Sequence, residues 1–351
     1  MHRCTPLLAA LLLASCRDPA AHRDWSAMDC NFAATVHGHG SIPAEAALDT
    51  VQRMSQEFEA LFTDYDPSGP LSVLRGRKGD TVAPDPRIVE VLRGALPAMA
   101  ASRGSLDIGL HDLKALWGLD AQPPHVPDSA AIDSVLRRRF GGAADSAGRS
   151  APPLALLPDG RVVLLVDSLP IDLGGVAKGW AVDRMSDKLA RLGFPAHLIQ
   201  GGGEIRARGR KATGAWRIGV KNPRATGTVT ALVSLDSGMA ISTSGDYERF
   251  FLENGVRYHH LFDPATGRPS RNGVASASLL CPTSAECDRW SKPMFLLGPE
   301  RGAPIADSLG IAVLWIREDA RGLCGFATAS WGRRLVRDTL PACPAAAVGH
   351  P

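Results

Sequence analysis

Residues 171–183 read IDLGGVAKGWAVD, an apolar run that ends in two glycines and then opens a helix. A second glycine-rich step, IQGGGEI, follows at 199–205. Gly174 and Gly175 permit close approach to the backbone, and the free N–H groups of a helix start favour an anion. The helix dipole disfavours the charge of Lys178 in the first turn, which a bound anion would explain. A tight turn with a solvated lysine gives the same pattern, so the rest of the chain must decide.

The segments around this corner alternate between strand and helix patterns. Strands met in hairpin order, with helices between them, predict an α+β fold of antiparallel sheets with flanking helices. The expected strands cover 161–175, 197–209, 215–222, 228–236, 238–245, 255–263 and 274–282. The expected helices cover 43–62, 87–101, 132–139, 177–192 and 284–297, and the last should be broken by Pro293.

The composition is that of a globular protein with a large core. The chain has 351 residues, of which 45% are hydrophobic and 21% charged, and its formal net charge is +3. This charge is too small to indicate a nucleic-acid or membrane-surface footprint, so we expect no nucleic-acid partner. The segment 121–160 is rich in Pro, Ala and Gly and is interpreted as a variable excursion without chemistry.

The first residues, MHRCTPLLAALLLASC, predict an export signal that is too short to span a bilayer as a mature helix. The ending Leu-Ala-Ser-Cys resembles the lipobox of bacterial lipoproteins, in which Cys16 would be acylated. A plain cleaved signal is the alternative. We therefore expect a signal peptide at 1–16, a tether at 17–25 and a lipid-anchored protein on the periplasmic side of a bacterial membrane.

The remaining cysteines show no metal-like spacing. An exported compartment permits disulfides, and Cys324 with Cys343 is the pair that we expect to be bridged. Cys281 and Cys287 are interpreted as structural or free. Cys30 is left over.

Four further segments carry residues with possible chemistry. Asp107 lies in an apolar, strand-like run and needs a partner, because an unpaired buried carboxylate costs several kcal/mol. Asp246 follows Ser244-Gly245 and could cap a helix. His259 and His260 alternate along a strand, so one ring should face inward.

Asp288 and Lys292 are four residues apart on one helical face. They can pair with each other or flank one ligand. A surface ion pair of this kind contributes less than about 1 kcal/mol, but the residues around these two are apolar.

Six stretches in this order resemble the ApbE family of FAD:protein FMN transferases, which are flavin-trafficking lipoproteins. They are SLDIGLHDLKALWGL, IDLGGVAKGWAVD, GGGEIRARG, SGDYERFF, YHHLFDPATGRP and AECDRWSKPMFLLG. The resemblance implies an ApbE-like architecture, related to the tunnelling fold, over residues 26–340 with a tail at 341–351. It also implies a site for FAD and a magnesium ion, with transfer of FMN to a threonine of an exported or membrane redox protein and release of AMP.

The matching motif positions imply the site residues. The metal would be held by the carbonyl of Ala177 and by Asp288, and His260 would be the base or phosphate partner for the acceptor hydroxyl, with Asp288 beside it in catalysis. The implied flavin and adenine contacts are Met28, Tyr65, Ser105, Leu106, Asp107, Gly174, Lys178, Trp180 and His260.

Three positions depart from the family pattern. Lys292 stands where a metal-binding threonine is usual, and its ammonium could sit in the magnesium position and neutralise Asp288. Arg75 replaces an asparagine, and the sequence Met28-Asp29-Cys30 replaces Met-Gly-Thr.

These departures leave more than one function open. The first is FMN transfer from FAD to an acceptor threonine. The second is a flavin carrier or pseudoenzyme that binds FAD without a metal and does not transfer FMN. A third is hydrolysis of FAD to FMN and AMP.

Overall fold

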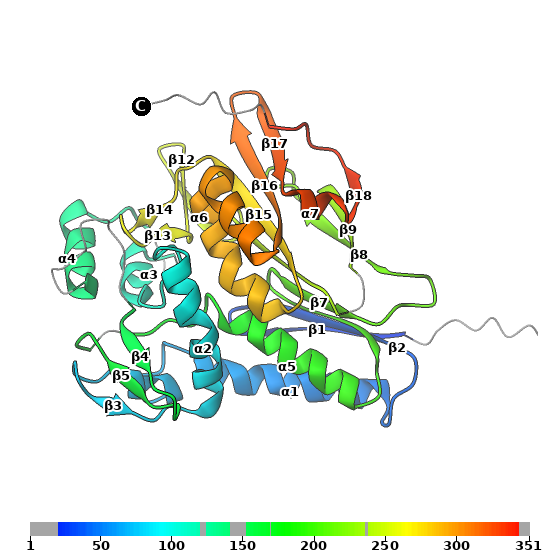
Figure 1. Ribbon diagram of the computed structural model, residues 1–351, viewed down its shortest axis with the longest axis horizontal. Helices are drawn as coiled ribbons and strands as arrows, with labels where there is room; N and C mark the ends of the chain where they lie inside the picture. The colour runs from blue at the N-terminus through cyan, green and yellow to red at the C-terminus, as the bar shows by residue number, and fades with distance from the viewer. Residues whose placement is uncertain (1–19, 120–123, 141–151, 169, 236–237, 344–351) are drawn as a thin grey trace, which may run out of the picture.

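The fold is built on a central antiparallel sheet of eight strands, ordered β1-β2-β6-β7-β10-β15-β16-β17 (Figure 1). The computed structural model describes residues 20–119, 124–140, 152–168, 170–235 and 238–343. The predicted α+β class with antiparallel sheets is confirmed. The strands of this sheet are β1 (Ala20–Ala27), β2 (Cys30–His37), β6 (Ala196–Gly201), β7 (Glu204–Arg208), β10 (Ala240–Gly245), β15 (Val274–Cys281), β16 (Ala312–Asp319) and β17 (Gly322–Ala327).

Both faces of this sheet are covered, so the central strand β15 is buried along its whole length. In β16, Val313 and Trp315 face the core under the helices, whereas Ala312, Leu314 and Ile316 face a second core on the other side. This is the alternation that a pleated strand imposes. The second core lies under β8 (Trp216–Lys221), β9 (Val229–Leu235), β18 (Leu335–Asp338) and α7 (Ala329–Gly332).

The helices that cover the first face position the site. Figure 1 shows α1 and α5 side by side, with α6 crossing the sheet beside them. Asp85 caps α2 by accepting from Arg87 N, with Pro86 in the first turn, and Thr283 caps α6 by accepting from Glu286 N. The helices are α1 (Ala44–Phe62), α2 (Pro86–Ala101), α5 (Ala177–Arg191) and α6 (Ser284–Leu309).

Smaller elements complete the fold around one end of this layer. A third apolar cluster joins α3 and α4 to the loop of β13 and β14 through Leu113, Trp117, Ile132 and Phe262. These elements are the 3-10 helix η1 (Pro70–Leu74), β3 (Thr81–Val82), α3 (His111–Trp117), α4 (Ser129–Phe140), β4 (Leu154–Leu156), β5 (Val162–Leu164), β11 (Phe250–Glu253), β12 (Val256–His259), β13 (Phe262–Asp263) and β14 (Arg268–Pro269).

The structure moves the predicted ends of the domain. The tether prediction is wrong from Ala20 onward, because residues 20–25 belong to β1, where Trp25 donates to Ser55 Oγ of α1. The tail prediction is wrong for 341–343, because Cys343 is bonded to Cys324 and its N–H donates to Gly325 O. The signal segment and Cys16 lie outside the described residues.

Helix α6 is longer than predicted. It continues through Pro293 to Leu309 with a kink at Gly298, whose φ is 67°. A proline removes one backbone hydrogen bond, and burial of Trp290, Met294 and Phe295 on either side outweighs that loss. Among the described residues, no helix is both long and apolar enough to cross a membrane.

Three local predictions are wrong. Among the described residues of the strand expected over 161–175, only β5 is strand and the others are loop. Asp107 lies in a turn segment that leads into α3 rather than in a strand. The segment after β10 is a turn and not a helix, and Asp246 pairs there with Arg224 at 2.7 Å instead of capping.

Candidate active site

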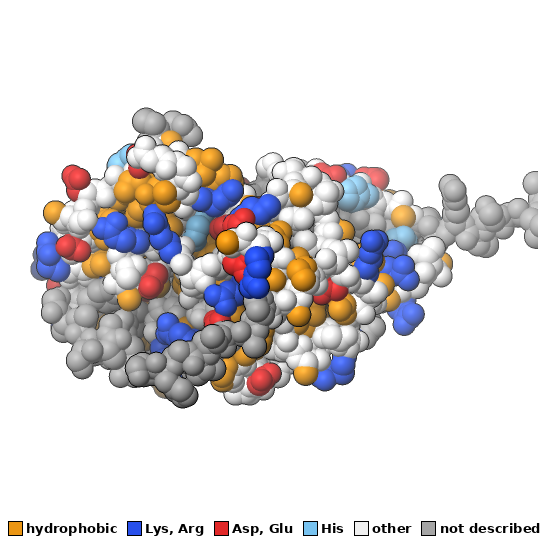
Figure 2. All heavy atoms as spheres, turned by 90° about the horizontal axis from the view of Figure 1, so that it is seen from above, with side chains coloured by type: hydrophobic (Ala, Val, Ile, Leu, Met, Phe, Trp, Pro, Cys, Tyr) orange, Lys and Arg blue, Asp and Glu red, His pale blue; other side chains and the backbone are white. Residues whose placement is uncertain are grey.

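A cavity of about 520 Å³ opens between the turns of the central sheet, the start of α5 and the loop before α3. This volume is within the usual range of small-molecule sites. On the face shown in Figure 2, basic and acidic side chains are interspersed and do not form a patch of one sign. The cavity brings together most of the predicted site residues: Met28, Tyr65, Ser105, Leu106, Asp107, Gly174, Ala177, Lys178, His260 and Lys292.

The strand-to-helix corner is fixed by a buried acid. Asp172 Oδ1 accepts from Gly174 N at 2.8 Å, and Asp172 also pairs with Lys114 of α3. Burial opposes the charge of Asp172, but Lys114 and the Gly174 N–H outweigh burial and lower its pKa. The acid therefore stays ionised and holds the glycine step in place.

Lys178 lies in the first turn of α5 and bends back to the corner. Its Nζ donates to Gly174 O at 2.6 Å. Burial disfavours the ammonium, but the carboxylates of Glu204 and Asp288 outweigh this and raise the pKa of Lys178. The cavity is therefore lined by a permanent cation at the start of a helix.

Asp288 is a fully buried acid behind the cavity wall. Its Oδ2 accepts from Gly179 N at 2.9 Å, and its Oδ1 accepts from Lys292 Nζ at 2.9 Å. Burial works against ionisation, but Lys292 and then Lys178 lower the pKa of Asp288. Lys292 Nζ also donates to Gly175 O at 2.9 Å.

Gly179 permits α5 and α6 to meet at this point. A Cβ at residue 179 would lie 2.6 Å from Asp288 Cβ and would also collide with the carbonyl oxygen of Ser284. Any larger residue would push the two helices apart. The start of α5 and Asp288 are thus held in direct contact.

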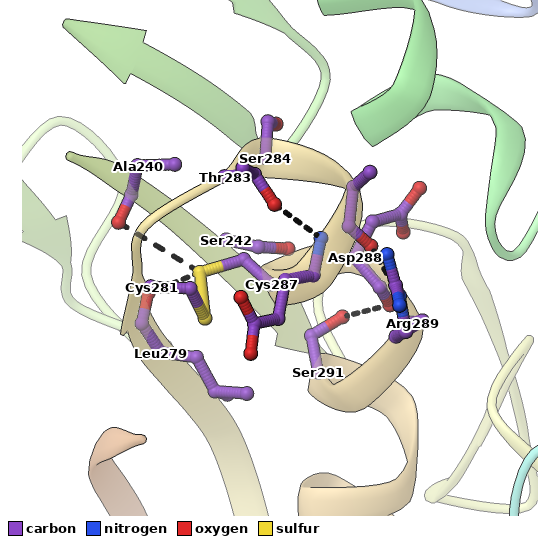
Figure 3. Close-up of a disulfide and its surroundings, with 12 residues drawn as sticks. Ala240, Ser242, Leu279, Cys281, Thr283, Ser284, Cys287, Asp288, Arg289 and Ser291 are labelled. Atoms are coloured by element: carbon purple, nitrogen blue, oxygen red, sulfur yellow. Dashed lines mark hydrogen bonds between the residues drawn. A yellow bond between two sulfur atoms is a disulfide. The ribbon is translucent and has the colours of Figure 1, made fainter. Parts of the chain in front are cut away.

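The start of α6 is held by a disulfide (Figure 3). Cys287, the residue before Asp288, is bonded to Cys281 at the end of β15, and the backbone N of Cys287 donates to Thr283 O at 3.2 Å. Ser291 Oγ donates to Asp288 O at 3.1 Å. The structural reading of this cysteine pair is confirmed, and so is the predicted Cys324–Cys343 bridge.

The two adjacent histidines face different surroundings, as their alternation predicts. His259 is buried, donates to Ser270 O at 3.0 Å and packs edge-on against Phe295. His260 lines the cavity, with Nδ1 3.3 Å from Arg249 O. Burial, reinforced by nearby cations, lowers the pKa of His260 well below its usual value, so the ring is neutral at pH 7.

Asp107 has the partner that its burial demands. Arg139 of α4 donates to Asp107 Oδ1 at 2.7 Å, and Gly109 N donates to the same atom at 2.8 Å. Asp107 Oδ2 is buried without a hydrogen-bond partner in the described part of the chain. The interpretation of 121–160 as a segment without chemistry is therefore wrong, because Arg139 belongs to it.

One predicted contact, Trp180, lies away from the cavity, and another, Tyr65, lies at its rim. Trp180 is buried between α1 and α5, edge-on against Phe58 and Phe62, and does not line the cavity. Trp180 lies three residues after Ala177, and there its ring faces the helical layer; its flavin contact stays a prediction. Tyr65 is 57% exposed at the rim, where its ring lies 6.2 Å from that of His111.

Three residues at the cavity escaped the sequence analysis. Glu204 lies in the quoted IQGGGEI step, and burial together with the charge of Asp288 raises its pKa to about 7. Arg249 donates to Asp29 O at 2.7 Å and so joins the β1–β2 turn to the β10–β11 turn. Cys30 is a free thiol whose pKa burial raises to about 12. The position of Glu204 directly after the three glycines of IQGGGEI is the sequence signal that could have placed it at the cavity.

The residues at Asp288 do not fit the magnesium ion that the resemblance implies. Both carboxylate oxygens already accept protein hydrogen bonds, and Lys292 holds the position that a metal would share with Asp288. Among the described residues, no group of three His, Cys, Asp or Glu side chains could hold a metal. Mg²⁺ prefers an octahedron of oxygen ligands and avoids a neighbouring ammonium. A second departure, Arg75, donates to Asp64 O and does not line the cavity.

Comparison with known proteins identifies the family of this chain. The model of the ApbE family matches residues 28–315. A FAD:protein FMN transferase of Vibrio cholerae is 29% identical over 333 residues, which cover 93% of this chain and 96% of that protein. The corresponding protein of Treponema pallidum is 31% identical over 290 residues, with 79% and 78% covered.

Solved structures agree as well. The flavin transferase ApbE from Vibrio cholerae superposes with a TM-score of 0.79 at 25% identity, over 91% of this chain and 100% of that one. The apo flavinyl transferase ApbE of Pseudomonas stutzeri gives 0.77 at 26% identity, over 92% and 98%. The predictions of an enzyme and of a transferase are confirmed. The chain belongs to the ApbE family.

Proposed function

We propose that this enzyme transfers FMN from FAD to a threonine hydroxyl of an exported or membrane-embedded redox protein and releases AMP. The observation that carries the proposal is the meeting of two ammonium groups, Lys178 and Lys292, with His260 in one cavity. The ammonium groups suit a diphosphate, and the histidine suits the proton of an incoming hydroxyl. The names of the relatives support the same reaction.

The reaction needs one bond to form and one to break. The threonine oxygen forms a bond to the phosphorus of the FMN half, and the phosphoric anhydride bond to AMP breaks. AMP leaves with the electron pair of that bond. The hydroxyl proton passes to the neutral His260 ring, whose low pKa a bound diphosphate would raise toward neutrality.

The enclosure of the cavity supports transfer over hydrolysis. Leu106, Leu261 and Phe262 lie in its lining beside His260 and exclude water from that side. Water that reached the phosphorus would instead release free FMN and AMP, which is the third function considered above.

A second candidate is a flavin carrier that binds FAD without transferring FMN. It is favoured by the pairing of Lys292 with Asp288, because one ammonium carries half the charge of magnesium. Binding of FAD would survive this replacement better than the chemical step would.

In-gel flavin fluorescence separates these functions. The purified protein is mixed with FAD and a candidate acceptor domain, and the acceptor band is examined after denaturation. We expect a fluorescent acceptor, and a loss of about a hundredfold in rate for His260→Asn. His39→Asn, an exposed histidine, is the matched control. Binding of FAD without labelling of the acceptor supports the carrier, and free FMN and AMP would indicate hydrolysis.

The location of the enzyme follows from its N-terminal segment. The proposal places it on the periplasmic side of a bacterial membrane, anchored by acylation of Cys16, where exported acceptors would be found. Fractionation of cells that express the full chain tests this. We expect the wild type in the membrane fraction and Cys16→Ser in the soluble fraction, whereas equal distribution of both would contradict the anchor.

A further inference from the structure

The Gly174–Gly175 step holds two lysines from different helices. Gly174 O accepts from Lys178 Nζ of α5 at 2.6 Å, and the next carbonyl, Gly175 O, accepts from Lys292 Nζ of α6 at 2.9 Å. Two adjacent carbonyls that each bind an ammonium bring two positive charges to one corner of the cavity. Both lysines line that cavity.

These ammonium groups are positioned to do more than neutralise buried acids. Lys292 lines the cavity, whereas the buried Asp288 does not. An ammonium has three N–H groups. Lys292 uses two of them on Asp288 and Gly175, and Lys178 uses one on Gly174. The described contacts therefore leave N–H groups on both lysines for a ligand.

The geometry at this corner is rigid. Lys292 is fixed by Asp288, whose other oxygen is bonded to Gly179 N, and α6 is fixed by the disulfide that precedes Asp288. A Cβ on Gly175 would lie 3.4 Å from Lys292 Cδ, so the lysine stem already lies against the backbone. Such preorganised donors stabilise an anion without the cost of rearrangement.

We infer that Lys292, beside Lys178, takes the place of a divalent cation, so that this enzyme binds the diphosphate of FAD directly and without metal. The inference rests on the proposed function only in taking FAD as the ligand. The two ammonium groups offer the diphosphate charged hydrogen bonds from two helices. The charge of Lys292 is therefore part of the binding site and not a defect in a metal site.

The test measures FAD affinity of the full chain by quenching of flavin fluorescence, in excess EDTA and in millimolar MgCl₂. We expect the wild type to bind FAD equally well in both. Lys292→Thr should bind about tenfold or more weakly in EDTA, because a charged hydrogen bond to the diphosphate is lost. Added magnesium should restore affinity in this variant, since Asp288 is then vacant. Lys78→Thr, an exposed lysine, is the matched control and should behave as the wild type.

The outcomes are separable. If wild-type FAD binding is lost in EDTA and restored by magnesium, the inference is wrong while the proposed function stands. If the wild type binds no FAD under either condition, the proposed function itself fails. Should Lys292→Thr be unfolded by circular dichroism, Lys292→Met and the metal response of the wild type decide the matter. A Lys292→Met protein that binds FAD as tightly as the wild type in EDTA overturns the inference.

Discussion

Two buried ion pairs border the cavity, and they are built differently. Asp288 and Lys292 are neighbours on one helix, and both oxygens of Asp288 are bonded within the protein. Asp107 takes its partner, Arg139, from a segment 32 residues later, and its Oδ2 has no partner among the described residues. One acid has both oxygens bonded within the protein, and the other has one oxygen that no described group bonds. The role of a carboxylate near a site thus depends on which of its oxygens already accept hydrogen bonds from the protein.

The difference also decides what the sequence can predict. The spacing of Asp288 and Lys292 follows from helical periodicity alone, and so do the predicted helices over 43–62 and 177–192, which α1 and α5 confirm within one or two residues. The pairing of Asp107 with Arg139 depends on tertiary contact. Neither composition nor period contains that information, so the need for a partner was predictable and its identity was not.

Other errors have the same origin. Residues 20–25 belong to an edge strand with one exposed face and show only a weak apolar period, whereas the lipoprotein resemblance predicts a tether there. Trp180 fits a motif position, but the packing of α5 against α1 turns its ring into the core. The local sequence pattern predicts a helix or strand, whereas the element that packs against it determines which of its faces is buried.

The largest expected effect comes from breaking the more deeply buried pair. Arg139→Met leaves the carboxylate of Asp107 buried without its cation, and we expect it to lower the free energy of unfolding by about 4 kcal/mol. Urea unfolding followed by circular dichroism measures this. The neighbouring Arg138→Met is the control, since Arg138 is exposed and should cost less than about 1 kcal/mol. Equal effects of the two variants would contradict a structural role for Arg139.

The pair on α6 should be somewhat less sensitive, because Lys292 is partly exposed. Asp288→Asn leaves an ammonium without its carboxylate and should lower the free energy of unfolding by about 3 kcal/mol. The double variant Asp288→Asn with Lys292→Met should recover part of this loss. Asp307→Asn, on the exposed face of the same helix, serves as control in urea unfolding. Failure of the double variant to recover any stability would mean that the ion pair is not the cause.

The disulfide Cys281–Cys287 lies directly before Asp288, whereas the disulfide Cys324–Cys343 lies in another part of the fold. Replacing Cys281 and Cys287 by alanine should cost about 2 kcal/mol, as expected for a short closed loop, and should weaken FAD binding by loosening the start of α6. Replacing Cys324 and Cys343 instead should lower stability at least as much, since its loop is longer, and leave FAD affinity unchanged. Parallel loss of FAD affinity in both double variants would argue against a local effect.

The smallest effect concerns a third pair near Asp107, at the rim. Asp64 accepts from His111 at 2.7 Å, and this hydrogen bond raises the pKa of His111. The pair therefore stabilises the fold fully below about pH 6.5 and loses its contribution as pH rises through the raised pKa. We expect a decline of at most about 1 kcal/mol between mildly acidic and alkaline pH. Urea midpoints should show this difference between the wild type and Asp64→Asn, and identical pH profiles would contradict it.

Gly179 has a consequence beyond this chain. Because no Cβ fits between α5 and Asp288, a hydrogen atom at position 179 sets the separation of the two helices. A homologue with a bulkier residue here must hold its helices farther apart, and its lysine could no longer reach the glycine step as Lys292 does. The residue at position 179 therefore indicates, from sequence alone, whether a related chain can place a lysine against the glycine step as Lys292 is placed here.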